Sequence, residues 1–146
     1  MLGIPGTSYR DLSAGLVAAY VLPSTGLGSH LPPVLAYYTL ACSVVKRSGG
    51  PEVPAIWMDI RVHPAVRRRG IGAIVLFDAF GRCVDSASEV AAAGIICIAE
   101  NLGASKWLLA HSFTNLDEQA PSFPQQHWLP MRAARDTCED VYGQDP

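Results

Sequence analysis

Residues 62–72 read Val-His-Pro-Ala-Val-Arg-Arg-Arg-Gly-Ile-Gly, and they form the most informative segment of the sequence. The stretch begins at the end of an apolar strand, continues as a basic turn with two glycines, and ends at the start of a helix. Such a turn points several backbone N–H groups into one concavity, and the helix N-terminus adds about half a positive charge. Glycine lets the backbone approach an anion closely, and the arginines supply charge-assisted hydrogen bonds. The stretch therefore predicts a diphosphate site. The alternative is an ordinary solvated basic turn, and the neighbouring segments must decide between the two.

The segments around this turn predict strands and helices in a definite order. Strands are indicated where Val, Ile, Tyr and Thr dominate, and helices where apolar residues recur every three to four positions. This order predicts a sheet covered by helices, in an α+β or α/β arrangement. Strands are expected over residues 34–45, 55–62, 94–99 and 126–133, and helices over residues 70–86 and 101–111.

The two ends of the chain carry weaker signals. Residues 15–22 fit a helix, because Ser8 and Asp11 resemble a capping box, and equally a strand, because Tyr20 and its valine neighbours favour one. Residues 136–146 carry four acids and no base. We expect them to form a solvated or frayed acidic tail.

Length and charge describe one soluble domain. The chain has 146 residues, of which 49% are hydrophobic, with 13 acids against 11 bases and a net charge of −2. A chain of this length can bury a core without disulfide or metal staples. The net charge gives no general attraction to nucleic acid or anionic lipid, so any anion site must be local.

The cysteines and the uncharged N-terminal part indicate a cytoplasmic protein. The four cysteines form no C-x-x-C pair and have no histidine at zinc-ligand spacing, so we expect reduced thiols and no metal. Residues 12–45 contain no Asp, Glu, Lys or Arg, but prolines and glycines interrupt them before the ~20 apolar residues that a membrane span needs. A signal peptide with its apolar core at residues 16–22 is the alternative, although that core is short.

The basic turn resembles the coenzyme-A signature of the GNAT N-acetyltransferases. The core of that signature is an arginine or glutamine, two residues, a glycine, one residue, and then a glycine or alanine. Arg67, Gly70 and Gly72 match it, and Val62 with the two residues after it matches the usual lead-in. A glycine that often follows the arginine is Arg68 here.

A second motif strengthens the resemblance. The family commonly shows Asn-x-x-Ala-x-x-Phe-Tyr, three residues, and then Gly-Phe. Asn101, Ala104 and Trp107 match its first part, Leu108 stands at the tyrosine, and Ser112 with the phenylalanine after it stands at Gly-Phe. Two motifs in the right order carry more weight than one, and the resemblance covers about residues 16–133.

The resemblance implies a fold, an activity and partners. The fold is an α+β fold in α/β/α layers, with a mixed, mainly antiparallel sheet and helices on both faces, shortened at the N-terminus, where the strand over residues 17–22 is favoured. The activity is transfer of an acetyl group from acetyl-CoA to a primary amine. Residues 36–41 and 129–131 look most like the toxin branch, which acetylates aminoacyl-tRNA and pairs with small DNA-binding antitoxins. A homodimer is a further expectation, and no membrane association is expected.

The resemblance also implies which residues hold the coenzyme. The strand before the turn pairs its backbone with pantetheine and polarises the thioester, while the turn and the helix start hold the diphosphate. The implied coenzyme-binding residues are Ile60, Arg61, Val62, Arg67, Arg68, Arg69, Gly70, Ile71, Gly72, Ala73 and Asn101.

Two carboxylates are candidates for catalysis. Asp59 could deprotonate or hold an ammonium group, and the alternative is a surface carboxylate paired to Arg61. Glu100 ends the next strand and is the second candidate, with capping of the following helix as the alternative. His111 and His127 are interpreted as structural, because the sequence offers neither an evident partner.

The residue at the usual general-acid position departs from the family. Leu108 stands where the family has the tyrosine that protonates the departing thiolate, and leucine cannot donate a proton. Loss of a general acid costs about 10²–10⁴-fold in rate. Tyr37 and Tyr38 are conceivable substitutes, with sheet packing as their alternative role. The sequence therefore predicts an N-acetyltransferase, with a catalytically impaired acyl-CoA-binding protein that acts through a partner as the alternative.

Overall fold

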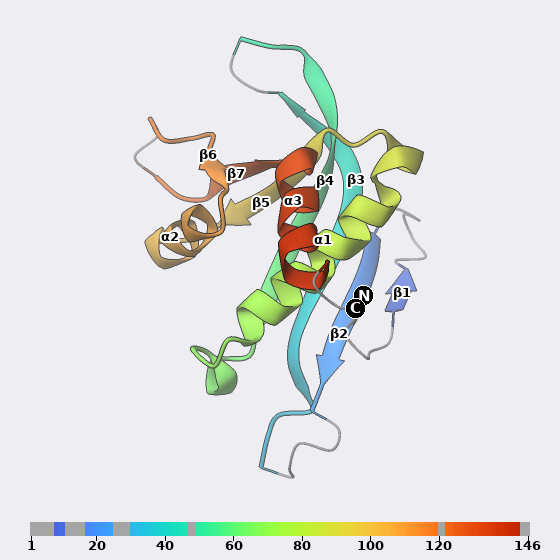
Figure 1. Cartoon of the computed structure of the whole chain (residues 1–146). Coiled ribbons are helices and arrows are strands. Elements are labelled where there is room, and N and C mark those ends of the chain that lie inside the picture. The colour runs from blue at the N-terminus through green and yellow to red at the C-terminus, as the bar shows by residue number, and fades with distance from the viewer. Residues whose placement is uncertain (1–7, 11–16, 25–29, 47–48, 120–121, 144–146) are drawn as a thin grey trace.

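A mixed sheet forms the frame of the protein (Figure 1). The computed structural model describes residues 8–10, 17–24, 30–46, 49–119 and 122–143. Within these ranges seven strands form one sheet in the order β1-β2-β3-β4-β5-β7-β6, antiparallel except for the parallel pair β4 and β5. The strands are β1 (Ser8–Arg10), β2 (Val17–Pro23), β3 (Val34–Lys46), β4 (Glu52–Val62), β5 (Gly94–Ala99), β6 (Thr114–Asn115) and β7 (Gln125–Pro130). The helices are η1 (Pro64–Val66), α1 (Ile71–Val90), α2 (Leu102–Ala110) and α3 (Met131–Tyr142).

The predicted α+β class and most predicted elements are confirmed. The N-terminal ambiguity is resolved in favour of a strand, since β2 pairs with β3 over its whole length and Ser8 lies in β1. Asp11, the other half of the supposed capping box, lies outside the described residues. Helix α1 continues one turn beyond the predicted end because Ala87, which is 6% exposed, extends the buried stripe.

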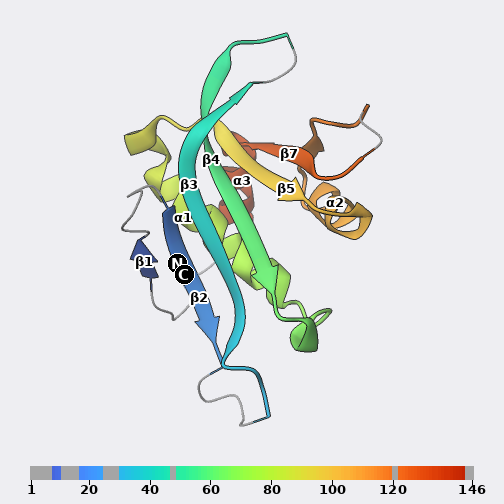
Figure 2. The same cartoon turned by 180° about the vertical axis from the view of Figure 1, so that it is seen from behind.

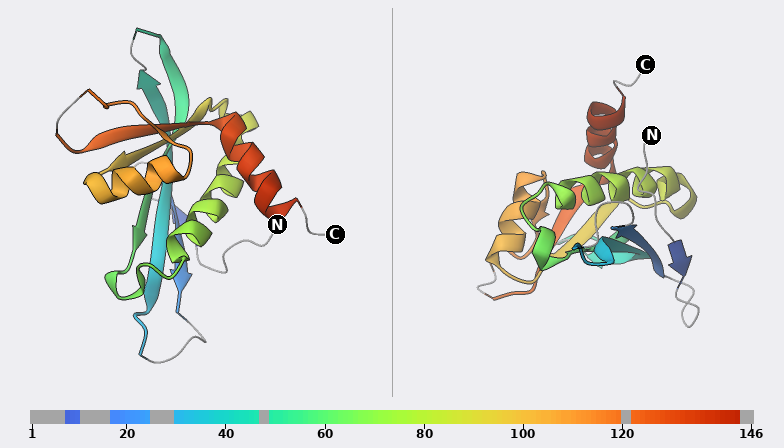
Figure 3. Two further views of the ribbon diagram at one scale, coloured as in Figure 1. Left: turned by 60° about the vertical axis from the view of Figure 1, so that its left-hand side comes forward. Right: turned by 90° about the horizontal axis from the view of Figure 1, so that it is seen from below.

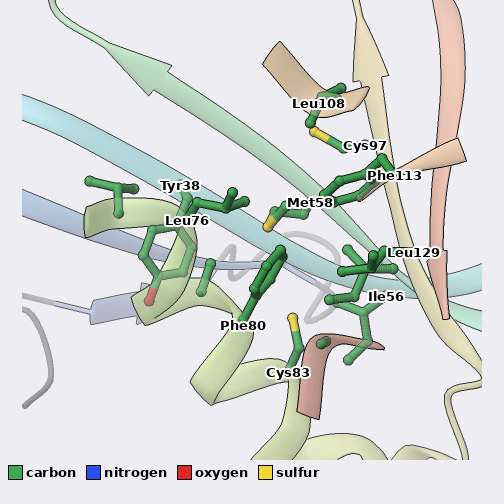
Figure 4. Close-up of a cluster of buried hydrophobic side chains, with 14 of the residues drawn as sticks. Tyr38, Ile56, Met58, Leu76, Phe80, Cys83, Cys97, Leu108, Phe113 and Leu129 are labelled. Atoms are coloured by element: carbon green, nitrogen blue, oxygen red, sulfur yellow. The ribbon is translucent and has the colours of Figure 1, made fainter. Parts of the chain in front are cut away.

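One hydrophobic core lies between the sheet and the helices (Figure 4). Ile56 and Met58 of β4 and Leu129 of β7 face it from the sheet, and Ile95 of β5 belongs to the same cluster. Phe80 of α1 and Leu108 of α2 face it from the helices. Burial of these apolar side chains is the main source of stability, and it fixes α1 against β3 and β4.

The described helices lie on one face of the sheet, rather than on both as predicted. In Figure 2 the strands stand in front of the helices, and in the right-hand view of Figure 3 the long α1 runs along one side of the strands. On the opposite face Trp57 packs against a small cluster that contains Ala55, Ile96 and Trp128. These bulky side chains cover part of that face themselves. The face is otherwise open over the start of β3 and the end of β4 in the described residues, where Tyr37 is 40% exposed.

The C-terminal segment corrects a prediction. Residues 131–133, expected to end the last strand, and residues 136–142, expected to begin a frayed acidic tail, both belong to helix α3, which starts directly after β7. Met131 and Ala134 are buried, and Cys138 packs against the same core. These residues lie at helical spacing and face α1, while the acids lie on the outer face. The tail is thus a surface helix with an acidic exposed side.

The cysteines and the helices relate to two predictions, that the thiols are reduced and that the chain has no membrane span. All four cysteines are free thiols, with Cys83 and Cys97 buried and Cys42 exposed. Among the described residues, no helix combines the length and apolar character needed to cross a membrane.

Candidate functional site

The two parallel strands separate toward their C-terminal ends, and this opens the sheet. Their pairing runs from Ala55 with Gly94 to Met58 with Cys97. Beyond that point β4 stays paired with β3 and β5 with β7, so the two strands diverge, as Figure 2 shows. Backbone groups that face the gap are left available to a ligand.

A cleft of about 590 Å³ fills this gap. It is bounded by the end of β4, the basic turn, the first turn of α1, the end of β5 and the first two turns of α2. Its lining residues are Asp59, Ile60, Arg61, Val62, Arg67, Arg68, Gly70, Gly72, Ala73, Cys97, Ile98, Glu100, Asn101, Gly103, Ala104, Trp107 and Leu108.

Most predicted site residues meet in this cleft. Both candidate carboxylates line it, as do the predicted coenzyme-binding residues other than Arg69 and Ile71. Arg69 is exposed outside the lining, and Ile71 packs against the core. Cys97 and Ile98 were missed, although both stand at the end of the apolar strand that precedes Glu100.

The basic turn directs backbone donors into the cleft. His63 caps the short helix η1, because its Nδ1 accepts a hydrogen bond from the Ala65 N–H at 3.0 Å. Arg68 and Gly70 have positive φ angles of 64° and 77°, which reverse the chain before α1. The first N–H groups of α1 have no partner within the helix and suit an anion. Arg67 folds back so that its Nε donates to the Val62 carbonyl oxygen at 3.4 Å, which holds its guanidinium beside the end of β4.

The two glycines of the turn serve different purposes. At Gly70 an added Cβ would meet open space, so its positive φ explains the glycine. At Gly72 an added Cβ would lie 3.3 Å from Cζ2 of Trp107 and 3.8 Å from Cγ2 of Val62. The sequence interpretation assigned Gly72 to close approach of phosphate. The structure adds a packing reason, because the indole of α2 lies against the start of α1.

The candidate carboxylates share one arginine. Nε of Arg61 lies 3.2 Å from Oδ1 and 3.3 Å from Oδ2 of Asp59. A terminal nitrogen of the same guanidinium lies 4.0 Å from Oε1 of Glu100. The charge of Asp59 is the main cause that raises the pKa of Arg61. The surface pairing considered for Asp59 is therefore present, and the arginine bridges the two diverging strands.

Asn101, not Glu100, caps helix α2. The Oδ1 atom of Asn101 accepts a hydrogen bond from the Ala104 N–H at 2.9 Å. This satisfies one of the donors at the helix start. Glu100 is thereby left to face the cleft and Arg61.

The inner end of the cleft is apolar. Leu108 is 2% exposed and packs in the core with Cys97 and Phe113. Burial, followed by the charge of Asp59, raises the pKa of the Cys97 thiol to about 12, so this thiol stays protonated. Tyr38 is no substitute acid, because it lies outside the lining and its hydroxyl is engaged by Asp78.

The two C-terminal histidines have partners that sequence could not reveal. Nδ1 of His127 lies 3.1 Å from the Gln125 carbonyl oxygen, which only accepts, so this nitrogen carries the proton. Nε2 then accepts from the Ser105 hydroxyl at 2.8 Å. His111 donates in the same way to the Trp107 carbonyl oxygen at 2.8 Å. Neither ring lines the cleft, in agreement with the structural interpretation.

Solved structures share this architecture. Comparison with protein-family models finds no match, and comparison with curated proteins finds none either. A chain of the KacTA–DNA complex is 21% identical, with a TM-score of 0.69 over 86% of this chain and 74% of that chain. AtaTR bound with acetyl-CoA is 19% identical, with a TM-score of 0.68 over 86% of this chain and 76% of that chain. AtaT complexed with acetyl-methionyl-tRNAfMet is 18% identical, with a TM-score of 0.67 over 86% of this chain and 77% of that chain.

These likenesses establish the fold. The chain has the fold of the GNAT-type toxin acetyltransferases, with the sheet opened between β4 and β5. The resemblance inferred from the two sequence motifs is confirmed at this level.

Proposed function

We propose that the protein is an acetyl-CoA-dependent N-acetyltransferase that transfers acetyl to a primary amine. The observation that carries this proposal is the cleft between the separated strands, which opens onto the glycine turn at the start of α1. Acetyl-CoA supplies an activated acyl group as a thioester, and the protein supplies binding and orientation.

The coenzyme would lie along the cleft with its diphosphate at the turn. The N–H groups at the start of α1, the guanidinium of Arg68 and the free nitrogens of Arg67 suit the diphosphate. Backbone groups of Ile60 to Val62 face the gap and suit the amide groups of pantetheine. One backbone N–H there would polarise the thioester carbonyl, so side-chain identity at those positions matters little.

The acidic end of the cleft would receive the amine. An ammonium group must lose a proton before it attacks the thioester, and Asp59 or Glu100 can take that proton directly or through water. Attack forms the new C–N bond and breaks the C–S bond, and the thiolate that leaves needs a proton. Leu108 cannot supply it, so water is the donor that we assign, and turnover would be slow.

The contents of the similar structures support an acceptor and a partner. AtaT has been solved with acetyl-methionyl-tRNAfMet, and its mutant with the C-terminus of the antitoxin AtaR. We propose the amino group of a charged tRNA as the acceptor, in the cytoplasm, and a small antitoxin as the partner. The exposed Arg69 lies outside the cleft lining, so it can meet a nucleic acid while Arg67 and Arg68 hold the coenzyme.

A second candidate function rests on Leu108. This residue is buried at the inner end of the cleft and has no proton to give. A protein that binds acyl-CoA without efficient turnover, and that acts through a partner, fits the same cleft.

Two measurements test the proposal and separate the candidates. Calorimetry should detect acetyl-CoA binding by the wild type and by the Arg132→Glu control, which alters a surface charge on α3, but not by Arg67→Glu. No wild-type binding at millimolar ligand contradicts both candidates. Thiol release with a panel of amines identifies the enzyme, and the enzyme is rejected if folded protein releases no more thiol than buffer. Leu108→Tyr should then raise kcat if only the acid is missing.

A further inference from the structure

The cleft has openings on both faces of the sheet. Along β4, Met58 faces the helical core and Ile60 and Val62 pack against it, so Asp59 and Arg61 point to the opposite, open face. On β5, Cys97 faces the core while Ile98 points to the open face, where it is 37% exposed. The basic turn and α2 bound the cleft on the helical side. The open face therefore presents a second entrance of different composition.

This second entrance contains two carboxylates and one cation. Asp59 comes from β4 and Glu100 from the end of β5, and Arg61 stands between them at 3.2 Å and 4.0 Å. The entrance therefore carries a net charge of −1. All three side chains are about half exposed, at 47%, 56% and 51% respectively. Ion pairs of this exposure are weak, so another cation can replace the guanidinium.

Apolar surface flanks the charged groups. Tyr37 lies directly opposite Arg61 in the register of β3 and β4, and it is 40% exposed. Ile98 lies on the other side of the gap, on the same face. A ligand whose cationic group sits between the carboxylates can thus rest an apolar group against either flank.

We infer that Arg61 occupies the position of the acceptor's ammonium group and must be displaced by it. The inference rests on the proposed function, from which it takes an acceptor whose amine lies α to an ester, and it adds the residue that selects this acceptor. The apolar flanks at Tyr37 and Ile98 favour an acceptor with an apolar side chain. A free amino acid is disfavoured, because its carboxylate would meet an entrance of net negative charge. Arg61 is thus a specificity-determining residue that admits amines able to compete for Asp59 and Glu100.

Equilibrium binding tests the inference independently of turnover. Leucine methyl ester is titrated into the protein and binding is followed by NMR chemical shifts, with free leucine and ethylamine as comparison ligands. The wild type should bind the ester more tightly than either. Arg61→Gln should tighten ester binding by about threefold to fivefold, since it removes a competing exposed cation. The Arg132→Gln control loses the same charge on α3 and should leave binding unchanged.

Two further readouts distinguish displacement from a structural role. Asp59→Asn and Glu100→Gln should each weaken ester binding, and the effect of Arg61→Gln should shrink at high salt, because salt screens exposed charges. Thermal melting checks that each variant is folded.

The outcomes separate this inference from the proposed function. Ester binding by a wild type that releases no thiol supports the inference and rejects the enzyme. Thiol release accompanied by weaker ester binding in Arg61→Gln overturns the inference and keeps the enzyme, since Arg61 would then hold the acceptor instead of competing with it. Equal binding of the ester and free leucine also overturns it.

Discussion

Replacing Tyr38 by phenylalanine should destabilise the fold strongly without creating a cavity. The Tyr38 hydroxyl donates to Oδ2 of Asp78 at 2.5 Å and accepts from Nε of Arg82 at 2.6 Å. Tyr38 and Asp78 are each 1% exposed. Tyr20 stacks on Tyr38 with ring centroids 5.0 Å apart, and Arg82 lies 4.1 Å above the Tyr20 ring. The hydroxyl thereby joins β3 to α1 through a buried carboxylate, and the Tyr20 ring attaches β2 to the same group of side chains.

The magnitude follows from the two lost hydrogen bonds. A hydrogen bond to a charged partner contributes about 1.5–3 kcal/mol. Asp78 and Arg82 keep their own contact at 3.2 Å, so the loss is smaller than the sum of both bonds. We expect about 2–4 kcal/mol, a large part of the ~5–15 kcal/mol that such a domain has. The melting temperature should fall by roughly 5–15 °C.

Urea unfolding of Tyr38→Phe and of a neighbouring control measures this loss. Tyr37→Phe removes the same hydroxyl from the adjacent residue, which is 40% exposed on the other face, and should change stability by less than about 0.5 kcal/mol. If the two variants are equally stable, the hydrogen bonds of the Tyr38 hydroxyl to Asp78 and Arg82 do not stabilise the fold as their distances indicate.

The same comparison has a pH dependence of definite sign. Burial, followed by the hydrogen bond to Asp78, raises the pKa of Tyr38 above its ordinary value near 10. The folded state therefore keeps this proton when the unfolded chain has lost it. The contribution of the Tyr38 hydroxyl to the free energy of unfolding is fully present below pH 10. It is lost as the pH rises above 10, by no more than about 1.4 kcal/mol per pH unit. The difference in the free energy of unfolding between the wild type and Tyr38→Phe should become smaller from pH 10 to pH 11.

Three further predictions test local structure. Gly70→Ala should lower the free energy of unfolding by about 1–2 kcal/mol, because φ is 77° at this position. The control Gly103→Ala lies in a helix and should be neutral or stabilising. Equal effects of the two substitutions would contradict the left-handed turn. Asn101→Ala should cost about 1 kcal/mol in urea unfolding, and no loss would mean that the cap is absent. In the folded protein Cys42 should react with a thiol reagent, while Cys83, whose pKa burial raises to about 12, should react only after unfolding.

Local sequence signals predicted most of the frame. The strand over residues 94–99 was placed correctly because its apolar run has strand length and clear boundaries. The cap at Asn101 is likewise a local feature, because its side chain and the helix that follows it form one local unit. The same holds for the turn at Gly70, where one glycine supplies a conformation that other residues adopt only with strain.

The features that sequence missed depend on distant partners. Residues 136–142 looked like a solvated tail because their acids dominate, and the helix becomes evident only when Met131 and Ala134 meet α1. The partners of His127 are likewise set by packing, since Ser105 reaches it from another element. No local pattern carries such information.

The order of the elements and the basic turn can be predicted from the sequence, as can the residue types at the ends of β4 and β5, because propensity, capping and glycine conformation are properties of neighbouring residues. The fold is needed to see where the strands separate, which side chains face the open side of the sheet, and that Arg61 joins Asp59 to Glu100. These features arise from register and packing between segments that are far apart in the chain.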